Sequence, residues 1–325
     1  MTNNVNKLLE VKNLTLGYKV YEGYLKVINN VSLDLYYGEK IGLIGESGCG
    51  KTTTMKAIMG ILPSNAVIQG GEILYKGVDL LKISKKEMDK IRKKNISMIF
   101  QDPALALNPV FKIREQFYDK IKYCSENKLT RTEIHNLSIK FLKDAALPEP
   151  DRILDSYPFQ LSGGMKQRVI IGMSLVSANE LLIADEPGTS LDVTIEDQIM
   201  RLLKSIVDQK GISIILISHA LGTVRKFVDR VYVMYAGTIV EFGPTQEIFS
   251  NPKHPYTALL LSSVPRLGGK EVSKGIPGVV PNYLNPPKGC RFVTRCPYKM
   301  DICEYETPKM YEVGKDHYAA CFHYK

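Results

Sequence analysis

Eight residues near the start of the chain could bind the phosphates of a nucleotide. The segment Gly45-Glu46-Ser47-Gly48-Cys49-Gly50-Lys51-Thr52 matches the pattern G-x-x-x-x-G-K-[ST]. In this pattern backbone N–H groups and the dipole of the following helix attract phosphate oxygens. Lys51 is expected to reach the β- and γ-phosphates, and the Thr52 hydroxyl to bind Mg²⁺. An apolar strand before the loop and a helix after it favour this interpretation over a chance glycine-rich turn.

Further polar side chains follow later apolar segments. Asp185 ends the run Leu181–Asp185, where a carboxylate could bind the metal, and Glu186 could orient or deprotonate an attacking water. Glu186 could otherwise be an ordinary acid at a helix start. His219 also follows an apolar run, and such a histidine is usually a structural hydrogen-bonding group. The shared sheet edge favours contact of His219 with the γ-phosphate.

A second glycine-rich helix start, Leu161-Ser162-Gly163-Gly164-Met165-Lys166-Gln167, has no evident use in a lone nucleotide domain. Ser162 is a good N-cap, so simple capping is one interpretation. Gly163 and Gly164 go further, because they remove side chains where an anion could approach the backbone amides. The chain has one phosphate-loop lysine, so we interpret this segment as completing the ATP site of a second molecule.

The elements that position these residues follow from the hydrophobic pattern. Continuous apolar runs predict a parallel sheet with both faces covered, and a hairpin is expected to turn at Ala236-Gly237. Strands are predicted at 8–18, 28–35, 41–44, 96–100, 181–185 and 212–217. Helices are predicted at 51–62, 113–126, 130–146 with Thr130 as N-cap, 163–177 and 193–210. The fold class is therefore α/β, with a helical stretch inserted between strands of the core.

The composition is ordinary for a globular protein of 325 residues, with 44% hydrophobic and 24% charged residues. No apolar run has the length of a membrane span, and the N-terminus does not resemble a signal peptide, so we expect a cytoplasmic chain. The net charge of +9 suits phosphate ligands, an anionic membrane or nucleic acid. Scattered, solvated lysines explain it equally well. The densest basic cluster, 82–94, is expected to be an exposed amphipathic segment.

With its motifs in this order, the chain resembles the ATP-binding subunits of ABC transporters. The resemblance implies a P-loop ATPase core with an N-terminal antiparallel β subdomain and a helical subdomain at about 103–178. It implies a Walker A loop, a Q-loop, a signature motif, a Walker B strand, a D-loop at Ser190-Leu191-Asp192, the catalytic Glu186 and the switch His219. Nucleotide contacts are then expected from Tyr18, Gly45, Ser47, Gly48, Cys49, Gly50, Lys51, Thr52, Thr53, Gln101, Ser162, Gly163, Gly164 and Asp192. Mg²⁺ ligands would be Thr52, Gln101 and Asp185, while Tyr21 and Tyr24 compete with Tyr18 for the adenine.

Finer features resemble the oligopeptide/dipeptide importer branch of that family. These are Phe100-Gln101-Asp102-Pro103, Leu107-Asn108-Pro109-Val110, Asn251-Pro252-Lys253-His254-Pro255-Tyr256-Thr257 and Ile276-Pro277-Gly278. The resemblance implies a peripheral subunit on the cytoplasmic face of the membrane. Its partners would be a second ATP-binding subunit of a different chain, two membrane permeases and an external solute-binding protein. Gln101 and the helical subdomain would couple to the permeases.

Alternatives to peptide import are oligosaccharide or nickel import by the same machinery, and a nucleic-acid-associated ATPase. The nucleic-acid type is less favoured, since the chain has neither a long coiled-coil insertion nor a second ATPase domain. Ala220 and Gly188 depart from the family pattern, which commonly has an acid and a Thr there. Neither departure removes a residue assigned to catalysis.

Four cysteines lie in the last part of the chain, at Cys290, Cys296, Cys303 and Cys321. We place a domain boundary near 250, with an ATP-binding domain at 1–250 and a loop-rich extension at 251–325. The cysteine spacing lacks the C-x₂₋₄-C pattern of a zinc knuckle. The four cysteines could instead hold a [4Fe–4S] cluster, and resemblance to the tail of dipeptide-importer ATPases supports that assignment. Zinc and free thiols remain alternatives, and Cys124 is not a candidate ligand.

Overall fold

The computed structural model describes residues 7–189, 191–263 and 275–325. The chain divides into two compact units. The first unit comprises the described residues of Met1–Tyr36, Lys40–Lys82 and His219–Lys325. The second comprises Tyr37–Glu39 and the described residues of Ile83–Ser218.

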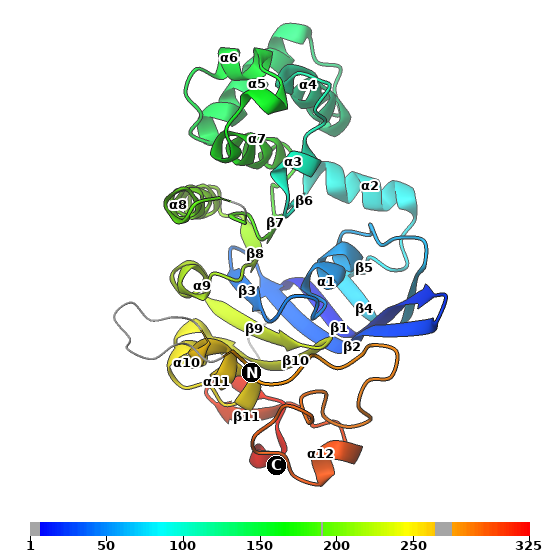
Figure 1. Ribbon diagram of the computed structural model, residues 1–325. Helices are drawn as coiled ribbons and strands as arrows, with labels where there is room; N and C mark the ends of the chain where they lie inside the picture. Colours follow the sequence, from blue (N-terminus) through cyan, green and yellow to red (C-terminus); the bar gives the residue numbers. More distant parts are fainter. Residues whose placement is uncertain (1–6, 190, 264–274) are drawn as a thin grey trace, which may run out of the picture. The chain divides into compact units, whose positions relative to one another are not determined.

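The first unit contains an antiparallel sheet with the strand order β2-β1-β4-β5 (Figure 1). Its strands are β1 (Lys7–Val20), β2 (Gly23–Tyr36), β4 (Ala66–Tyr75) and β5 (Val78–Asp79). The predicted strands at 8–18 and 28–35 are confirmed and extend to a tight turn. Strand β4 escaped prediction because Gly70 and Gly71 interrupt its apolar pattern. At Gly71 the φ angle is +97° and a Cβ would lie 2.6 Å from the Leu14 Cα, so only glycine fits against β1.

A second set of strands in this unit runs in the order β11-β12-β10-β9-β3. Strand β3 (Lys40–Ile44) pairs in parallel with β9 (Arg230–Tyr235), which forms an antiparallel hairpin with β10 (Thr238–Pro244). The hairpin turns at Ala236 and Gly237 with φ of 43° and 81°, which confirms the predicted turn. Helices α1 (Lys51–Ile58) and α9 (Leu221–Phe227) belong to the same unit.

The C-terminal part continues this sheet. Strands β11 (Tyr311–Gly314) and β12 (His317–Ala319) are antiparallel, and β12 pairs with β10. The Phe242 ring stacks on Tyr232 and Tyr318, with centroids 5.1 and 4.8 Å away. The remaining helices are α10 (Thr245–Ser250), α11 (Pro255–Ser262), α12 (Ile302–Tyr305) and the 3₁₀ turn Phe322–Tyr324. Through the pairing of β12 with β10, this C-terminal part joins the sheet of the unit.

The second unit contains three parallel strands in the order β8-β7-β6. These are β6 (Ile96–Ile99), β7 (Leu181–Asp185) and β8 (Ser213–Ile217), and every residue in them is buried. This burial is the reason for their continuous apolar sequences. The helices are α2 (Lys85–Lys94), α3 (Pro103–Ala106), α4 (Ile113–Cys124), α5 (Arg131–Asp144), α6 (Pro150–Asp155), α7 (Gly163–Leu175) and α8 (Val193–Lys210), with a 3₁₀ turn at Pro158–Gln160. Helices α4 to α7 gather in one group (Figure 1).

Side-chain caps set the start of several helices in this unit. The Thr130 hydroxyl accepts from the Glu133 N–H, and the Glu133 carboxylate accepts from the Thr130 N–H, which forms a capping box at the predicted N-cap of α5. Ser84 and Glu87 form the same motif at α2. Helix α8 ends at Gly211, whose φ is 65°.

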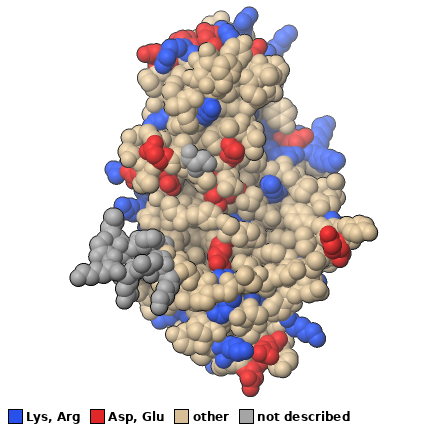
Figure 2. All heavy atoms as spheres, in the orientation of Figure 1, with Lys and Arg blue, Asp and Glu red and all other residues tan. Residues whose placement is uncertain are grey.

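Residues 85–94 of the basic cluster at 82–94 form α2, and only Met88 in that helix is buried. Figure 2 shows the Lys and Arg side chains gathered on its surface. The predicted exposed, amphipathic segment is therefore confirmed. Among the described residues, no helix combines the length and apolar character that crossing a membrane requires.

Candidate nucleotide-binding site

The phosphate loop joins β3 to α1 in the first unit. Lys51 is only 5% exposed, and its Nζ donates to the Gly45 and Glu46 carbonyl oxygens at 2.7 and 3.0 Å. The ammonium therefore lies within the turn of the loop. Cys49 is buried with its Sγ 3.7 Å from the Lys51 Nζ, and burial raises the pKa of its thiol. Cys49 thus contributes a neutral, packed side chain to the loop.

Two loop glycines are required by close packing. A Cβ at Gly45 would lie 2.1 Å from the Met234 carbonyl oxygen of β9, at a φ of +152°. A Cβ at Gly50 would lie 2.6 Å from the Ile28 side chain, at a φ of +108°. Both positions exclude a larger residue for reasons internal to the protein.

The three candidate adenine-binding tyrosines have different surroundings. The Tyr18 hydroxyl donates to the Thr53 Oγ1 at 3.3 Å, so its ring lies at the first turn of α1, next to Thr52. The Tyr24 hydroxyl donates to the Val67 carbonyl oxygen at 3.1 Å, and Tyr21 is fully exposed. Of the three, Tyr18 is the one that contacts the phosphate-loop helix.

Glu186 follows β7 in the second unit and has an unusual backbone. Its φ is +51°, a conformation that residues other than glycine rarely adopt. Its Oε2 accepts from the Gln101 Nε2 at 2.7 Å and from the Thr189 hydroxyl at 3.1 Å. Glu186 and Asp185 are both buried. The structure thus brings Gln101 and Glu186 together, and strain at such a position often accompanies a functional role.

Signature residues in the same unit pack against the start of α8. Ser162 caps α7 by accepting from the Met165 N–H, as the capping interpretation predicts. A Cβ at Gly163 would lie 3.1 Å from Leu191, and one at Gly164 would lie 2.8 Å from Ile195. Packing therefore also requires these glycines. The Asp192 carboxylate caps α8 through the Ile195 N–H, while Ser190 lies outside the described residues.

The two departures from the family pattern have structural correlates. A Cβ at Gly188 would lie 2.4 Å from the Glu196 Cγ, so a Thr there would displace Glu196. Ala220 is the N-cap of α9 and makes no side-chain capping bond. His219 is exposed just before it, in the first unit.

The predicted site residues are divided between the two units. The first unit carries Tyr18, the phosphate loop, Thr53, His219 and the cysteines, and the second carries Gln101, Ser162, Gly163, Gly164, Asp185, Glu186 and Asp192. The prediction missed three side chains of the C-terminal part that contact the phosphate loop, namely Tyr256, Tyr283 and Arg295. Tyr256 lies in the segment Asn251–Thr257 that resembles the importer branch, but nothing in the sequence showed that any of the three contacts the loop.

The four C-terminal cysteines are free thiols that are buried or half-buried. Burial raises the pKa of Cys290 to about 12, and the neighbouring thiols of Cys303, Cys296 and Cys321 add to the shift. The four groups therefore lie within electrostatic range of one another. Within the described residues, however, no three His, Cys, Asp or Glu side chains are grouped so as to hold a metal ion. The structure gives no support to the predicted iron–sulfur cluster or to zinc.

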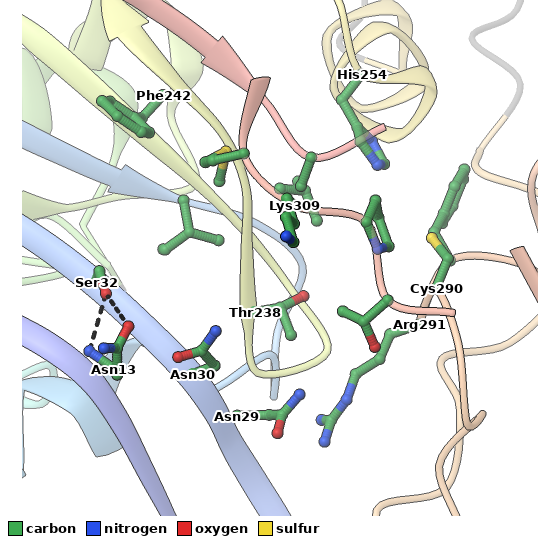
Figure 3. Close-up of a pocket in the computed structure, with 17 residues that line it drawn as sticks. Asn13, Asn29, Asn30, Ser32, Thr238, Phe242, His254, Cys290, Arg291 and Lys309 are labelled. Atoms are coloured by element: carbon green, nitrogen blue, oxygen red, sulfur yellow. Dashed lines mark hydrogen bonds between the residues drawn. The ribbon is translucent and has the colours of Figure 1, made fainter. Parts of the chain in front are cut away.

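A separate pocket of about 250 Å³ lies between β2, β10 and the C-terminal part (Figure 3). Asn29, Thr238, Cys290 and Arg291 are among its lining residues. None of its lining residues belongs to the predicted nucleotide site. The pocket marks the junction between the hairpin and the cysteine-bearing segment.

Comparison with known proteins identifies the family. The family model "ABC transporter" matches residues 28–189, and "Oligopeptide/dipeptide transporter, C-terminal region" matches residues 240–303. The dipeptide transport ATP-binding protein DppD of Bacillus subtilis is 43% identical over 98% of this chain and 95% of its own length. The chain belongs to the ABC transporter family. The oligopeptide transport ATP-binding protein OppD of Escherichia coli is 40% identical over 97% of this chain and 93% of its own.

Solved structures agree with this assignment. A dimeric, post-hydrolysis ATP-binding cassette, MJ0796 bound to ADP and Pi, matches with a TM-score of 0.65 and 27% identity. The match covers 73% of this chain and 98% of the cassette. The cbiO1 protein of Clostridium perfringens, part of the ABC transporter complex cbiONQ, matches with a TM-score of 0.64 and 28% identity over 76% of this chain and 92% of its own. The chain therefore has the fold and the enzyme class of an ABC-type ATPase.

Proposed function

We propose that this chain is the ATP-hydrolysing subunit of an importer for dipeptides and oligopeptides. The observation that carries the proposal is the near full-length similarity to DppD and OppD, which includes the C-terminal region of that transporter group. The phosphate loop and the Gln101–Glu186 pair supply the groups that ATP hydrolysis requires.

We propose that ATP binds between the phosphate loop of one subunit and the signature helix start at Ser162 of the other. In this scheme Lys51 leaves its loop carbonyls for the β- and γ-phosphates, and Tyr18 stacks on the adenine. Glu186 orients the attacking water and accepts its proton, while Gln101 and Thr189 hold the carboxylate in place. His219 contacts the γ-phosphate.

Thr52, Asp185 and Gln101 offer the oxygen ligands that Mg²⁺ prefers in proteins. In this structure the Gln101 amide nitrogen contacts Glu186, which leaves the amide oxygen to act as a ligand. When bound, the ion would offset charge on the β- and γ-phosphates.

The partners in this proposal are a second, paralogous ATP-binding subunit, two membrane permeases and, indirectly, an external solute-binding protein. Residues 103–178 would form the helical subdomain that contacts a permease on the cytoplasmic face of the membrane. Exposed apolar side chains in this stretch support the idea, since such side chains often mark binding surfaces. They are Leu105, Val110, Phe111 and Phe159. We assign residues 1–250 to the ATP-binding domain and 251–325 to the extension.

An importer of oligosaccharides or nickel built on the same machinery is the second candidate. Uptake assays separate it from the first. Deleting the gene should abolish uptake of labelled dipeptides and oligopeptides, and the wild-type chain should restore it. Loss of oligosaccharide or nickel uptake with unchanged peptide uptake would favour the second candidate and contradict the first.

Replacing the phosphate-loop lysine tests the ATPase itself. Lys51→Ala should lower the hydrolysis rate of the purified chain by at least about 100-fold, because the ammonium that stabilises the transferred phosphoryl group is lost. The same variant should fail to restore peptide uptake. Lys56→Ala, in the same helix, serves as the matched control and should retain the wild-type rate. Turnover by Lys51→Ala at the level of this control would disprove the assigned role of the loop.

We further propose that Cys290, Cys296, Cys303 and Cys321 hold a [4Fe–4S] cluster, with zinc as the alternative. The grounds for this proposal are the number of cysteines in this part of the chain and the resemblance of the segment to the tail of dipeptide-importer ATPases. Anaerobically purified protein should show broad visible absorption that a Cys290→Ser/Cys296→Ser variant lacks. A colourless preparation containing stoichiometric zinc would contradict the cluster.

A further inference from the structure

Three side chains from the C-terminal part of the chain bind the phosphate loop directly. The Tyr256 hydroxyl accepts from the Glu46 N–H at 2.8 Å, and the Tyr283 hydroxyl donates to the Gly48 carbonyl oxygen at 2.8 Å. Arg295 pairs with the Glu46 carboxylate through two nitrogens, at 2.7 and 3.1 Å. We call Tyr256, Tyr283 and Arg295 the C-terminal clamp.

Arg295 is built into the protein rather than lying on its surface. Its side chain is 3% exposed, and its Nε and Nη2 also donate to the Pro277 and Ile276 carbonyl oxygens. A further bond reaches the Tyr235 hydroxyl at 3.4 Å. These partners match the five N–H donors of a guanidinium. A buried group with every donor engaged has little freedom, so it fixes the Glu46 carboxylate in one place.

The clamp also fixes the orientation of the peptide group whose carbonyl oxygen binds the Lys51 ammonium. In a trans peptide the N–H and C=O groups point in opposite directions. Because Tyr256 binds the Glu46 N–H, the Gly45 carbonyl oxygen is directed to the other side, where the Lys51 Nζ lies 2.7 Å away. At Gly48 the φ is +77° and a Cβ added there would meet no atom within 4 Å, so packing around this residue is sparse. The Tyr283 bond restrains that part of the loop.

Arg291 reinforces the same region through the β9–β10 hairpin. Its guanidinium donates to the Ala236 carbonyl oxygen and, at 3.1 Å, to that of Lys26. Next to Ala236, the Gly237 N–H donates to the Cys49 carbonyl oxygen at 2.8 Å. Figure 3 shows the Arg291 side chain extending away from Cys290 toward the part of the pocket where Asn29 lies. The cysteine-bearing segment thus supports the phosphate loop by a second route.

We propose that Tyr256, Tyr283 and Arg295 are positioning residues that hold the phosphate loop in the conformation that binds ATP. This inference rests on the proposed ATP-binding function of the loop. It gives the extension a role in nucleotide affinity, whatever its cysteines bind. The clamp acts on the loop before the nucleotide arrives, so its loss should weaken ATP binding and leave the chemical step nearly unchanged.

Steady-state kinetics of full-length variants test the proposal. Tyr283→Phe removes one hydroxyl and should raise the KM for ATP about five-fold, with kcat within about two-fold of wild type. Arg295→Ala should raise KM about 30-fold, and Arg295→Lys, which keeps the charge without the fork, about 10-fold. Tyr305→Phe, an exposed tyrosine of the same extension, is the control and should match wild type. Thermal unfolding of each variant shows whether it is folded.

Combining substitutions tests whether the contact itself is responsible. If Arg295 acts through Glu46, Glu46→Gln together with Arg295→Lys should weaken ATP binding no more than the worse single variant. Additive losses would contradict direct coupling. Equal KM values for Tyr283→Phe, Arg295→Lys and Tyr305→Phe, all folded, would overturn the proposal.

Calorimetry with ATP separates this proposal from the ATPase proposal. A wild-type chain that binds ATP but never hydrolyses it would contradict the proposed function. The order of ATP affinities among the same variants would still decide the role of the clamp. If Arg295→Ala does not fold, Tyr283→Phe provides the deciding comparison.

Discussion

Glu186 combines a strained backbone with a carboxylate that already has defined partners. Its Oε2 accepts from Gln101 and Thr189, and its own N–H donates to the Ile217 carbonyl oxygen at 2.9 Å. A group that orients water must keep one direction, and these contacts provide it. Gln101 lies two residues before the stretch 103–178 that is proposed to contact a permease, so its amide could report the state of the carboxylate to a partner subunit.

Replacing this carboxylate by its amide is the sharpest test of its role. Glu186→Gln should lower the rate of ATP hydrolysis by about 100- to 10,000-fold, because the general base is lost while the shape is kept. ATP should still bind, so the variant should elute as a dimer in size-exclusion chromatography with ATP and Mg²⁺.

The exposed Glu126→Gln variant serves as the control for this measurement. It should hydrolyse ATP at the wild-type rate and should not accumulate as a dimer. A Glu186→Gln protein that stays monomeric in ATP would count against a nucleotide shared between two subunits.

Helix α11 shows how one element anchors the extension to the phosphate loop. The His254 Nδ1 accepts from the Tyr256 N–H at 3.0 Å and so caps the helix that carries Tyr256. The His254 ring lies against the ring of Phe292. In the sequence, Phe292 lies between Cys290 and Cys296. Glu241 on β10 accepts from the His254 N–H at 2.8 Å and from the His317 ring at 2.7 Å. The geometry of this cap thus determines where the Tyr256 hydroxyl lies.

The cap should make stability depend on pH. Burial lowers the pKa of His254 to about 4, although the nearby Glu241 charge opposes the shift. In the unfolded chain the pKa is about 6.5. The stabilising contribution is therefore complete above about pH 6.5 and is lost as the pH falls toward 4, because the unfolded chain then binds the extra proton.

Urea unfolding at a series of pH values measures this loss. The free energy of unfolding should fall by on the order of 2–3 kcal/mol between pH 7 and 4 through this group. His254→Asn keeps an N-cap acceptor but cannot titrate, so its free energy should fall less over the same range. If the free energy of unfolding falls equally with pH in the wild type and in His254→Asn, His254 does not cause the pH dependence.

Across the molecule, the features that could be predicted best are those that depend on residues close together in the sequence. Strand β7 and helix α8 begin and end where the pattern placed them, and Thr130 caps α5 as expected. Local periodicity and capping chemistry decide such elements. Strand β4 was missed because Gly70 and Gly71 break its apolar pattern, and of these Gly71 is required by close contact with β1.

Contacts between distant parts of the chain leave no such pattern. The motif identified the phosphate loop, but not that Arg295, 249 positions later, would pair with Glu46. The sequence pattern also did not predict that Leu191 packs on Gly163 and Ile195 on Gly164, since only the fold brings these residues together. The sequence therefore identifies the groups that bind nucleotide better than the groups that hold them in place.

The long separation between the loop and its clamp has a consequence during synthesis. Ribosomes add about 5–20 residues per second, so Arg295 follows Glu46 after roughly 10 to 50 seconds. A nascent chain would thus expose its phosphate loop long before the residues that brace it are translated. Prematurely terminated products should accordingly bind ATP poorly, which would keep unfinished subunits from competing with complete ones for their permeases.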